Sequence, residues 1–474
     1  MMATAAARAQ FSFATLLAAT RGRIIARPAG SLGVTSVTSD SRAAGEGSLF
    51  VALAGERTDG HRYLGTAAAA GATVLLVSNA QAAARAEELE GIAARHGTGI
   101  IAVSDPLTAL QDLARAHMRS IPSVTRIAVT GSNGKTTTKE IIGAILGRVA
   151  PTAMNEGNLN SEVGLPLACC AVAADHRYAV LEMGMNHVGE MDVLVDIVRP
   201  DLALITNIAT AHIGLLGSQD AIAAEKKKVF ALFDGRQTGF LPEEERYRAF
   251  LSAGVRGRIV SFGPKSTPGF GGSESMGLGG TIIHWEGSLV RFPLFGPHNL
   301  ANALGAISVA RELGVPNAEV RDGLESVTPL FGRSQVIEGA VTVIADCYNA
   351  NPDSMDRALD FIESLPWTGR KIAILGAMRE LGDETDAAHE ALGRRLRFST
   401  LDALMLLGPE MERALEASEG ATAYRRWFAT IDPLASYLSP FIREGDLVLL
   451  KGSRSLEMEG LLPILTAGEG GARC

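Results

Sequence analysis

Short apolar runs alternate along this chain with longer stretches in which apolar residues recur every three or four positions. The runs are RIAVT (126–130), YAVLEMG (178–184), LALITNI (202–208), TVIAD (342–346), KIAILG (371–376), LDALMLLG (401–408) and DLVLLKG (446–452). Each run predicts a buried β-strand, and the alanine-rich stretches between them predict helices. This alternation is typical of α/β domains with mostly parallel sheets, in which ligands bind at the carboxyl edge of the sheet.

The chain of 474 residues is long enough for about three domains of ordinary size. We expect three α/β domains, which comprise residues 1–105, 106–330 and 331–474. The third begins near Phe331 and has four strand candidates of its own. Inside the second, PKSTPGFGGSESMGLGG (264–280) predicts a surface loop or hairpin because glycine, serine and proline dominate it.

Composition limits the possible functions. A formal charge of −8 argues against nucleic acid as a partner, because nucleic-acid binders need a basic surface. Four scattered cysteines form neither a disulfide framework nor a metal-binding spacing. The chain has no clean signal-peptide core and no apolar segment of about 18 residues that could span a membrane. We expect a cytoplasmic protein.

The stretch TGSNGKTTTKE (130–140) lies between the predicted strand at 126–130 and a helix. Ile142, Ile145, Leu146 and Val149 fall on one face of that helix. Free N–H groups and the helix dipole at such a junction favour anions. The glycines are three positions apart, whereas the usual P-loop of nucleotide hydrolases has them five apart. We predict ATP binding by Gly131, Ser132, Asn133, Gly134, Lys135, Thr136 and Thr137, with the Lys135 charge facing the β/γ-phosphates and the Thr136 hydroxyl on Mg²⁺.

Seven further stretches make a family resemblance specific. They are NEGNLNSEVGLPL (155–167), LEMGMNHVGEM (181–191), TNIATAHIGLLGS (206–218), GPHNLANALGA (296–306), DCYNANPDSM (346–355), ILGAMRELGDET (374–385) and LLKGSRSLEME (449–459). Together with the short glycine loop they resemble the Mur ligases, ATP-dependent amide-forming enzymes of peptidoglycan precursor synthesis. YNANP and the GxMxELG stretch are characteristic of the branch that adds D-alanyl-D-alanine to UDP-N-acetylmuramoyl-tripeptide.

The resemblance covers the whole chain and implies a role for each domain. The first would be a small α/β domain that binds the UDP substrate. The second would be a P-loop ATPase-like domain with a mostly parallel sheet, and the third a Rossmann-like domain that binds the incoming dipeptide. It also implies ATP and Mg²⁺ as cofactors, a carbamylated lysine, and two small-molecule partners, UDP-N-acetylmuramoyl-tripeptide and D-alanyl-D-alanine. We expect a monomer.

Metal and lysine roles depend on the resemblance more than on the residues themselves. It implies Mg²⁺ ligands at Thr136, Glu182 and His212, and a carbamate on Lys226 that helps position a second Mg²⁺. By itself a histidine at a strand end is more often structural, and AEKKKVF (224–230) could be a solvated basic face. Clustered ammonium groups, however, favour the neutral form of one lysine, which is the form that reacts with CO₂. Relatives commonly have an acidic residue where Lys228 stands.

The remaining expected contacts also come from matching motifs. The resemblance places Asn299, Arg333 and Asp346 on ATP, with Lys135, Lys226, His212 and Arg333 as the catalytic set. The expected substrate contacts are Ser39, Asp40, Ser41 and Arg42 at the UDP end, Asn158 and Asn160 along the route to the reaction centre, and Asn349, Lys451, Ser453 and Arg454 around the dipeptide. From the residues alone, Asn299 is equally a helix cap, and His389 fits either helix capping or substrate contact. Cys347 and Ala377 replace the family's usual serine and aspartate.

The sequence leaves two rival functions open. Folate polyglutamylating ligases share the short loop and the overall architecture, but they would be expected to lack YNANP and the UDP-binding first domain. A P-loop nucleotide hydrolase or switch would use the same loop without an amino-acid substrate. Release of phosphate in the absence of the two ligase substrates would indicate the latter.

Overall fold

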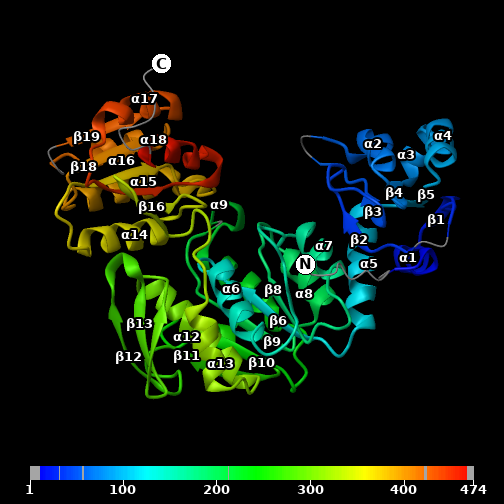
Figure 1. Ribbon diagram of the computed structural model, residues 1–474, viewed down its shortest axis with the longest axis horizontal. Helices are drawn as coiled ribbons and strands as arrows, with labels where there is room; N and C mark the ends of the chain where they lie inside the picture. Colours follow the sequence, from blue (N-terminus) through cyan, green and yellow to red (C-terminus); the bar gives the residue numbers. More distant parts are fainter. Residues whose placement is uncertain (1–10, 31–32, 56–57, 212, 421–423, 467–474) are drawn as a thin grey trace.

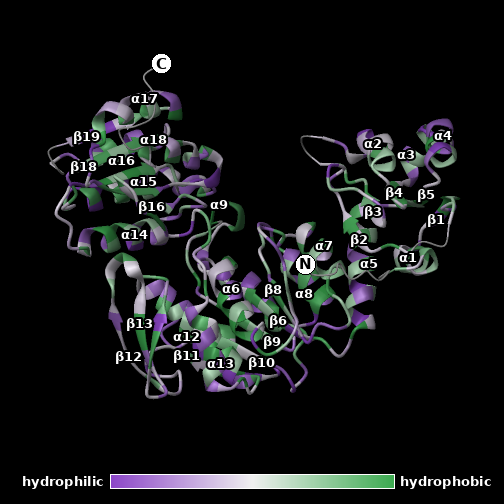
Figure 2. Cartoon of the chain, in the orientation of Figure 1, coloured by the Kyte–Doolittle hydropathy of each residue, from purple (hydrophilic) through white to green (hydrophobic). Residues whose placement is uncertain are grey.

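The computed structural model describes residues 11–30, 33–55, 58–211, 213–420 and 424–466. Three lobes follow one another along the chain, and each is built on its own sheet (Figure 1). Helices cover the sheets, and the hydrophobic strands lie inside each lobe while the outer helix faces are hydrophilic (Figure 2). The predicted mixed α/β class is confirmed. No helix in these described ranges is long and apolar enough to cross a membrane.

The first lobe has a five-stranded sheet in the order β1-β5-β4-β3-β2, parallel except for β1. Its last helix, α5, begins at the N-cap Asp105, whose side chain accepts a hydrogen bond from Thr108 N. Leu110 and Leu113 of α5 belong to one core that continues into the central lobe, so this helix joins the two lobes. The elements are β1 (Arg23–Ala26), β2 (Ser36–Thr38), β3 (Ser48–Val51), β4 (Val74–Ser78), β5 (Gly99–Val103), α1 (Phe13–Thr20), η1 (Gly60–Tyr63), α2 (Leu64–Ala69), α3 (Asn79–Ala84), α4 (Ala86–His96) and α5 (Pro106–Ser120).

The central lobe has a six-stranded, all-parallel sheet in the order β11-β10-β9-β6-β8-β7. Strand β6 lies in the middle, which places the glycine loop that follows it at the centre of the carboxyl edge. The strands are β6 (Thr125–Thr130), β7 (Thr152–Met154), β8 (Tyr178–Glu182), β9 (Leu202–Ile205), β10 (Thr238–Pro242) and β11 (Arg258–Phe262). The helices are α6 (Lys135–Leu146), α7 (Gly164–Cys170), α8 (Glu190–Val198), α9 (Ile213–Leu216), α10 (Gln219–Lys227), η2 (Lys228–Phe230), α11 (Arg248–Ser252), α12 (Pro297–Glu312) and α13 (Asn317–Glu325).

The helix after the glycine loop is shorter than its apolar pattern predicted. Ile142, Ile145 and Leu146 are buried as expected, but α6 ends at Leu146 and Val149 lies beyond it, 39% exposed. Gly147 follows directly and donates its N–H to Gly143 O, after which the chain turns. The prediction for Val149 was therefore wrong, because the helix ends at Leu146 and Val149 lies in the turn that follows.

The glycine-rich stretch at 264–280 is more ordered than a surface linker. It includes β12 (Phe270–Ser275) and η3 (Gly277–Gly279), and with β13 (Thr281–Trp285) and β14 (Ser288–Phe292) it forms a three-stranded antiparallel sheet. Ile283, Trp285 and Phe292 pack into the core formed with α12 and α13. The predicted hairpin is confirmed. It is part of a sheet because one face of that sheet is buried against α12 and α13.

The third lobe has a six-stranded sheet in the order β15-β16-β20-β17-β18-β19, in which only β15 is antiparallel. The four predicted strands are confirmed, while the two edge strands were not predicted. Its elements are β15 (Gln335–Ile337), β16 (Thr342–Asp346), β17 (Lys371–Gly376), β18 (Ala403–Leu407), β19 (Tyr424–Phe428), β20 (Leu447–Lys451), α14 (Pro352–Ser364), η4 (Gly382–Glu384), α15 (Thr385–Leu396), α16 (Met411–Ala417), α17 (Ile431–Phe441), η5 (Arg454–Leu456), η6 (Met458–Leu461) and α18 (Leu462–Thr466).

The central and third lobes touch at several points. Phe295 stacks on Phe361 with ring centroids 4.1 Å apart, and Thr210 Oγ1 donates to Asp353 Oδ2 at 3.0 Å. Gly214 N donates to Glu380 O at 3.0 Å. A Cβ added at Gly214 would lie 2.2 Å from Gly382 N, so the two lobes meet backbone to backbone at these glycines.

Candidate active site

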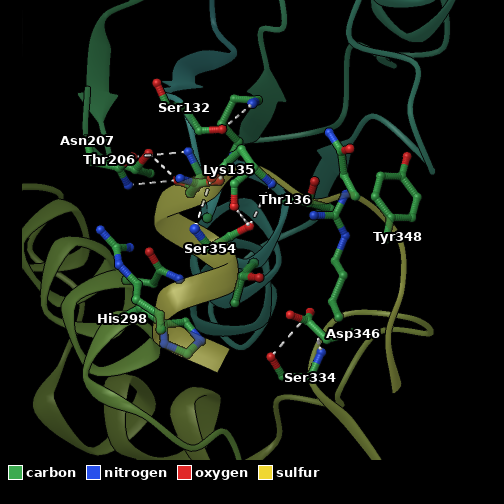
Figure 3. A pocket seen from close by; sticks show the side chains of 18 of the residues that line it. Ser132, Lys135, Thr136, Thr206, Asn207, His298, Ser334, Asp346, Tyr348 and Ser354 are labelled. Atoms are coloured by element: carbon green, nitrogen blue, oxygen red, sulfur yellow. Dashed lines mark hydrogen bonds between the residues drawn. The ribbon is translucent and has the colours of Figure 1, made fainter. Parts of the chain in front are cut away.

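A cavity of about 1200 Å³ lies between the central and third lobes (Figure 3). Its walls come from the glycine loop, from the ends of β8 and β9, from the start of α12, and from the loops after β16 and β20. Most of the predicted site residues line it, namely Ser132, Asn133, Gly134, Lys135, Thr136, Thr137, Asn158, Asn160, Glu182, Asn299, Arg333, Asp346, Asn349, Lys451, Ser453 and Arg454.

The glycine loop is held by hydrogen bonds to the end of β9. Asn207 accepts from Ser132 N through its backbone carbonyl and from Asn133 N through its side chain. Thr206 Oγ1 donates to Asn133 O at 2.6 Å. Gly131 has φ +145°, and a Cβ there would lie 1.8 Å from Thr206 Oγ1. The position therefore accepts only glycine, which explains the first glycine of the motif in steric terms.

Thr136 and Glu182 meet at the start of α6. Thr136 Oγ1 donates to Glu182 Oε2 at 2.7 Å, and Asn160 Nδ2 donates to Glu182 Oε1 at 2.6 Å. The structure therefore places two of the predicted metal ligands, Thr136 and Glu182, in direct contact. The third, His212, lies outside the described residues.

Two lysines lie close to this carboxylate. The Lys135 amine donates to Gly131 O at 3.0 Å, and burial lowers the pKa of Lys135 against the opposing effect of Glu182. Lys226 is 1% exposed. Burial, reinforced by the positive charge of Lys135, lowers the pKa of Lys226 well below its ordinary value. A solvated basic face is thus excluded for Lys226, and its amine is held toward the neutral form.

The neighbours of Lys226 explain the unusual residue at position 228. Glu225 is buried, and its Oε1 accepts from Gly189 N and Met191 N at the start of α8. Lys228 Nζ lies 2.7 Å from both Glu225 Oε2 and Asp192 Oδ2. The cation at 228 thus belongs to an ion-pair network that ties α10 to α8, and those hydrogen bonds raise the pKa of Lys228 against its partial burial.

The start of α12 carries a pair of buried asparagines. Asn299 Nδ2 donates to Phe295 O at 2.9 Å, and its Oδ1 accepts from Asn302 Nδ2 at 3.3 Å. Sequence reasoning missed Asn302, although it stands three positions after Asn299 and therefore on the same helix face. A Cβ at Gly134 (φ +78°) would lie 2.5 Å from Asn302 Oδ1. Asn302 thus packs directly on the glycine loop.

His298, another residue that sequence reasoning missed, also lines the cavity. Burial lowers its pKa to about 4, against the opposing effect of Asp346. The ring is therefore neutral near pH 7, which is the form that can both donate and accept a hydrogen bond.

The third lobe contributes cations to the opposite wall. The Arg333 guanidinium lies 3.9 Å from the centre of the Tyr348 ring. Lys451 is 1% exposed, and its Nζ donates to Asp346 Oδ2 at 2.6 Å. Asp346 Oδ1 accepts from Ser334 N at 3.1 Å. The predicted ATP contact Asp346 and the predicted dipeptide contact Lys451 are therefore partners of each other in this arrangement.

Two further predicted residues prove to have structural partners. Ser453 Oγ accepts from Arg379 N at 2.8 Å. His389, whose role was open, is fully buried; Nε2 accepts from Met378 N at 3.1 Å, and Nδ1 donates to Thr385 O at 2.7 Å. His389 therefore supports the loop after β17 and does not line the cavity.

The predicted UDP contacts lie in the first lobe, away from this cavity. Ser39, Asp40, Ser41 and Arg42 follow β2, and none of them lines it. Arg42 Nη2 donates to Asp40 Oδ2 at 2.6 Å, and this bond is the main cause that lowers the Asp40 pKa to about 2. The Arg42 side chain is 88% exposed, so its guanidinium is accessible to an anionic ligand.

Three domain models of one protein family match the chain. They are the Mur ligase family catalytic domain at residues 33–118, the Mur ligase middle domain at 129–310, and the Mur ligase glutamate ligase domain at 332–454. The chain belongs to the Mur ligase family.

Relatives named for one branch of that family match nearly the whole chain. A protein of Treponema pallidum named UDP-N-acetylmuramoyl-tripeptide--D-alanyl-D-alanine ligase is 39% identical over 96% of this chain and 98% of its own length. The crystal structure of MurF from Acinetobacter baumannii superposes with a TM-score of 0.84 at 32% identity, covering 96% of this chain and 98% of that one. MurF ligase from Thermotoga maritima, solved in complex with ADP, gives a TM-score of 0.75 at 27% identity over 93% and 97%.

Proposed function

We propose that this protein joins D-alanyl-D-alanine to UDP-N-acetylmuramoyl-tripeptide with hydrolysis of ATP to ADP and phosphate, giving the pentapeptide precursor of peptidoglycan. The observation that carries the proposal is the cavity in which the phosphate loop and Glu182 face Arg333 and Lys451 of another lobe. The name of the relative with 39% identity supports this substrate pair.

The reaction follows from the chemistry of the cavity walls. The γ-phosphoryl group of ATP passes to the terminal carboxylate of the tripeptide, giving an acyl phosphate and ADP. Lys135 and Arg333 offset negative charge on the transferring group. The dipeptide amine then attacks the acyl carbon, the tetrahedral intermediate expels phosphate, and the amine loses a proton as the amide forms. Closure of the third lobe over the loop would exclude water, which would otherwise hydrolyse the acyl phosphate.

Mg²⁺ fits the oxygen atoms at the start of α6. In the described part of the chain, no three acidic, histidine or cysteine side chains cluster so that they could hold a metal alone. Thr136 Oγ1 and Glu182 would hold the ion together with phosphate oxygens and His212, in keeping with the preference of Mg²⁺ for substrate phosphates and one or two carboxylates. When bound, it would neutralise charge on the transferring phosphoryl group.

Lys226 is proposed as the carbamate. Its neutral amine would add to CO₂, forming an N–C bond and releasing one proton, and the resulting carboxylate would supply another oxygen ligand. The burial of Lys226 and its lowered pKa favour this reaction, since only the neutral amine is nucleophilic. Uptake of ¹³CO₂ should give a carbamate NMR signal that Lys226→Met removes.

We assign residues 1–105 to the UDP substrate, 106–330 to ATP and 331–474 to the dipeptide. Ser39, Asp40, Ser41 and Arg42 would hold the diphosphate, since hydroxyls and an accessible guanidinium suit that group. Asn158 and Asn160 would lie along the tripeptide, and Asn349, Lys451, Ser453 and Arg454 around the dipeptide. We propose that the protein works in the cytoplasm, where ATP and UDP-linked precursors are made, and that it acts as a monomer.

A coupled ADP assay with substrates omitted one at a time tests the reaction. The ligase forms ADP at full rate only when the tripeptide nucleotide and the dipeptide are both present. Equal ADP formation without either substrate would favour a nucleotide hydrolase or switch, and ADP formation with a folate and glutamate would favour a folate ligase. Repeating the assay with tripeptides that differ at the third residue identifies which one this chain prefers.

A further inference from the structure

Lys139 is the one lysine of TGSNGKTTTKE to which nucleotide chemistry gives no role. It stands one helical turn after Lys135 in α6, and it is 1% exposed. Burying an ammonium group is costly, and an aliphatic side chain would fill the same space without that cost. The partners of the ammonium group therefore indicate what it contributes.

The Lys139 ammonium has two partners. Its Nζ donates to Asn155 O at 2.5 Å and lies 2.9 Å from Glu140 Oε1. Asn155 is also 1% exposed, so the carbonyl that Lys139 holds is shielded from water. A charge-assisted hydrogen bond in such surroundings is stronger and more directional than one in solvent.

Asn155 in turn holds Glu182 through its side chain. Asn155 Oδ1 accepts from Glu182 N at 2.8 Å, and Nδ2 donates to Glu182 O at 3.1 Å and to Leu159 O at 2.8 Å. Strand β7 pairs with β8 as far as Met154 opposite Val180. The Asn155 amide thus continues the ladder beyond the end of β7 and satisfies both backbone groups of Glu182.

The fixed backbone determines where the Glu182 carboxylate lies. One oxygen accepts from Thr136 Oγ1, in the first turn of the helix that also carries Lys139, and the other accepts from Asn160 Nδ2, in the loop after β7. Through Asn155, Lys139 therefore links α6 to the end of β8, and so couples the two elements that carry Thr136 and Glu182. We propose that Lys139 and Asn155 are positioning residues that hold Glu182 against Thr136 for the metal that accompanies ATP. This inference rests on the proposed function.

Metal affinity tests this directly, because partners of a metal ligand typically change affinity about 10- to 100-fold when removed. The full-length protein is titrated with Mn²⁺ in the presence of ADP, and free Mn²⁺ is followed by electron paramagnetic resonance. Lys139→Met and Asn155→Leu should each weaken Mn²⁺ binding at least about tenfold. Asn155→Asp, which keeps the acceptor for Glu182 N but loses the donor, should fall between them and the wild type.

A core substitution separates positioning from general stability. Ile142→Ala removes a fully packed side chain from the same helix and should lower the melting temperature without weakening Mn²⁺ binding. If Lys139→Met and Asn155→Leu bind Mn²⁺ as the wild type does, or no more weakly than Ile142→Ala at equal loss of stability, the positioning role is overturned. The ligase itself is judged separately, by wild-type amide formation in the coupled assay.

Discussion

Asn351 Nδ2 donates to Asn133 Oδ1 at 2.7 Å and so joins the third lobe to the glycine loop of the central lobe across 218 positions of sequence. Asn351 is also the N-cap of α14, because its Oδ1 accepts from Ser354 N. The cap fixes which end of the Asn351 amide faces the loop. Asn133 must therefore present its oxygen, and its buried Nδ2 has no partner among the described residues.

Asn351→Asp should weaken ATP binding. Aspartate caps a helix as well as asparagine does, but it replaces the donor with a negative charge beside the phosphate loop. We expect the KM for ATP to rise about tenfold, as for loss of a hydrogen bond together with charge repulsion. Ser354→Ala, which removes half of the capping box without touching Asn133, is the control. Equal changes in KM for both variants would contradict a direct effect on the loop.

Lys226 should make the free energy of unfolding change with pH in the range below the ordinary pKa of lysine. Its pKa in the folded protein is well below the ordinary lysine value, so between the two values the unfolded chain binds more protons than the folded chain. The free energy of unfolding should therefore rise with pH through this window and reach a constant lower value below it. Lys226→Met should be most stabilised relative to the wild type at neutral pH, with the difference shrinking toward pH ~10.

Denaturant unfolding in CO₂-free buffer at several pH values measures this difference. Lys227→Met, which makes the same substitution at a half-exposed position on the same helix, is the matched control. A constant difference between wild type and Lys226→Met over the whole range would show that Lys226 keeps an ordinary pKa.

Neutralising Asp346 should lower the stability of the protein more than neutralising Lys451. Asp346→Asn removes the negative charge that lies 2.6 Å from a buried ammonium, and leaving such a charge uncompensated costs about 3 kcal/mol or more. Lys451→Met leaves Asp346 its bond from Ser334 N and should cost less. Urea unfolding of both variants measures the difference, and a larger loss for Lys451→Met would contradict it.

Gly134 and Gly217 have similar backbone conformations, but only Gly134 lacks space for an added methyl group, so Gly134→Ala and Gly217→Ala should have different effects. Gly134 has φ +78° and Gly217 has φ +83°, so alanine costs each about 1–2 kcal/mol in backbone strain. A Cβ at Gly217 meets nothing within 4 Å, whereas at Gly134 it meets Asn302. Both variants should lose stability, and only Gly134→Ala should lose most of its nucleotide affinity by calorimetry with ADP. Comparable ADP affinity in the two variants would show that the Asn302 side chain moves aside without disturbing the nucleotide site.

Local patterns predicted the elements that carry the phosphate site. The strand at 126–130, the glycine loop and the following helix are contiguous in sequence, and their chemistry depends on neighbours within a few residues. The same reasoning could not find β15 (Gln335–Ile337) or β19 (Tyr424–Phe428). The first is only three residues long, and the second carries two arginines because it lies at the edge of its sheet.

Contacts between distant segments were beyond sequence reasoning. Lys226 stands in a run of three lysines that resembles a solvated face, and only the packing of α10 makes it buried. Asn155 gave no signal because its role depends on the point at which β7 stops pairing with β8. The bond between Asn133 and Asn351 depends on how two lobes meet.

The Gly214–Gly382 contact leaves no space for even one added carbon atom between the lobes at this point. A single added carbon would lie 2.2 Å from a backbone nitrogen, well inside van der Waals distance. Backbone atoms cannot rotate aside as a side chain can. A compound that wedges one methyl group into this seam would therefore hold the lobes apart without occupying the nucleotide or dipeptide positions.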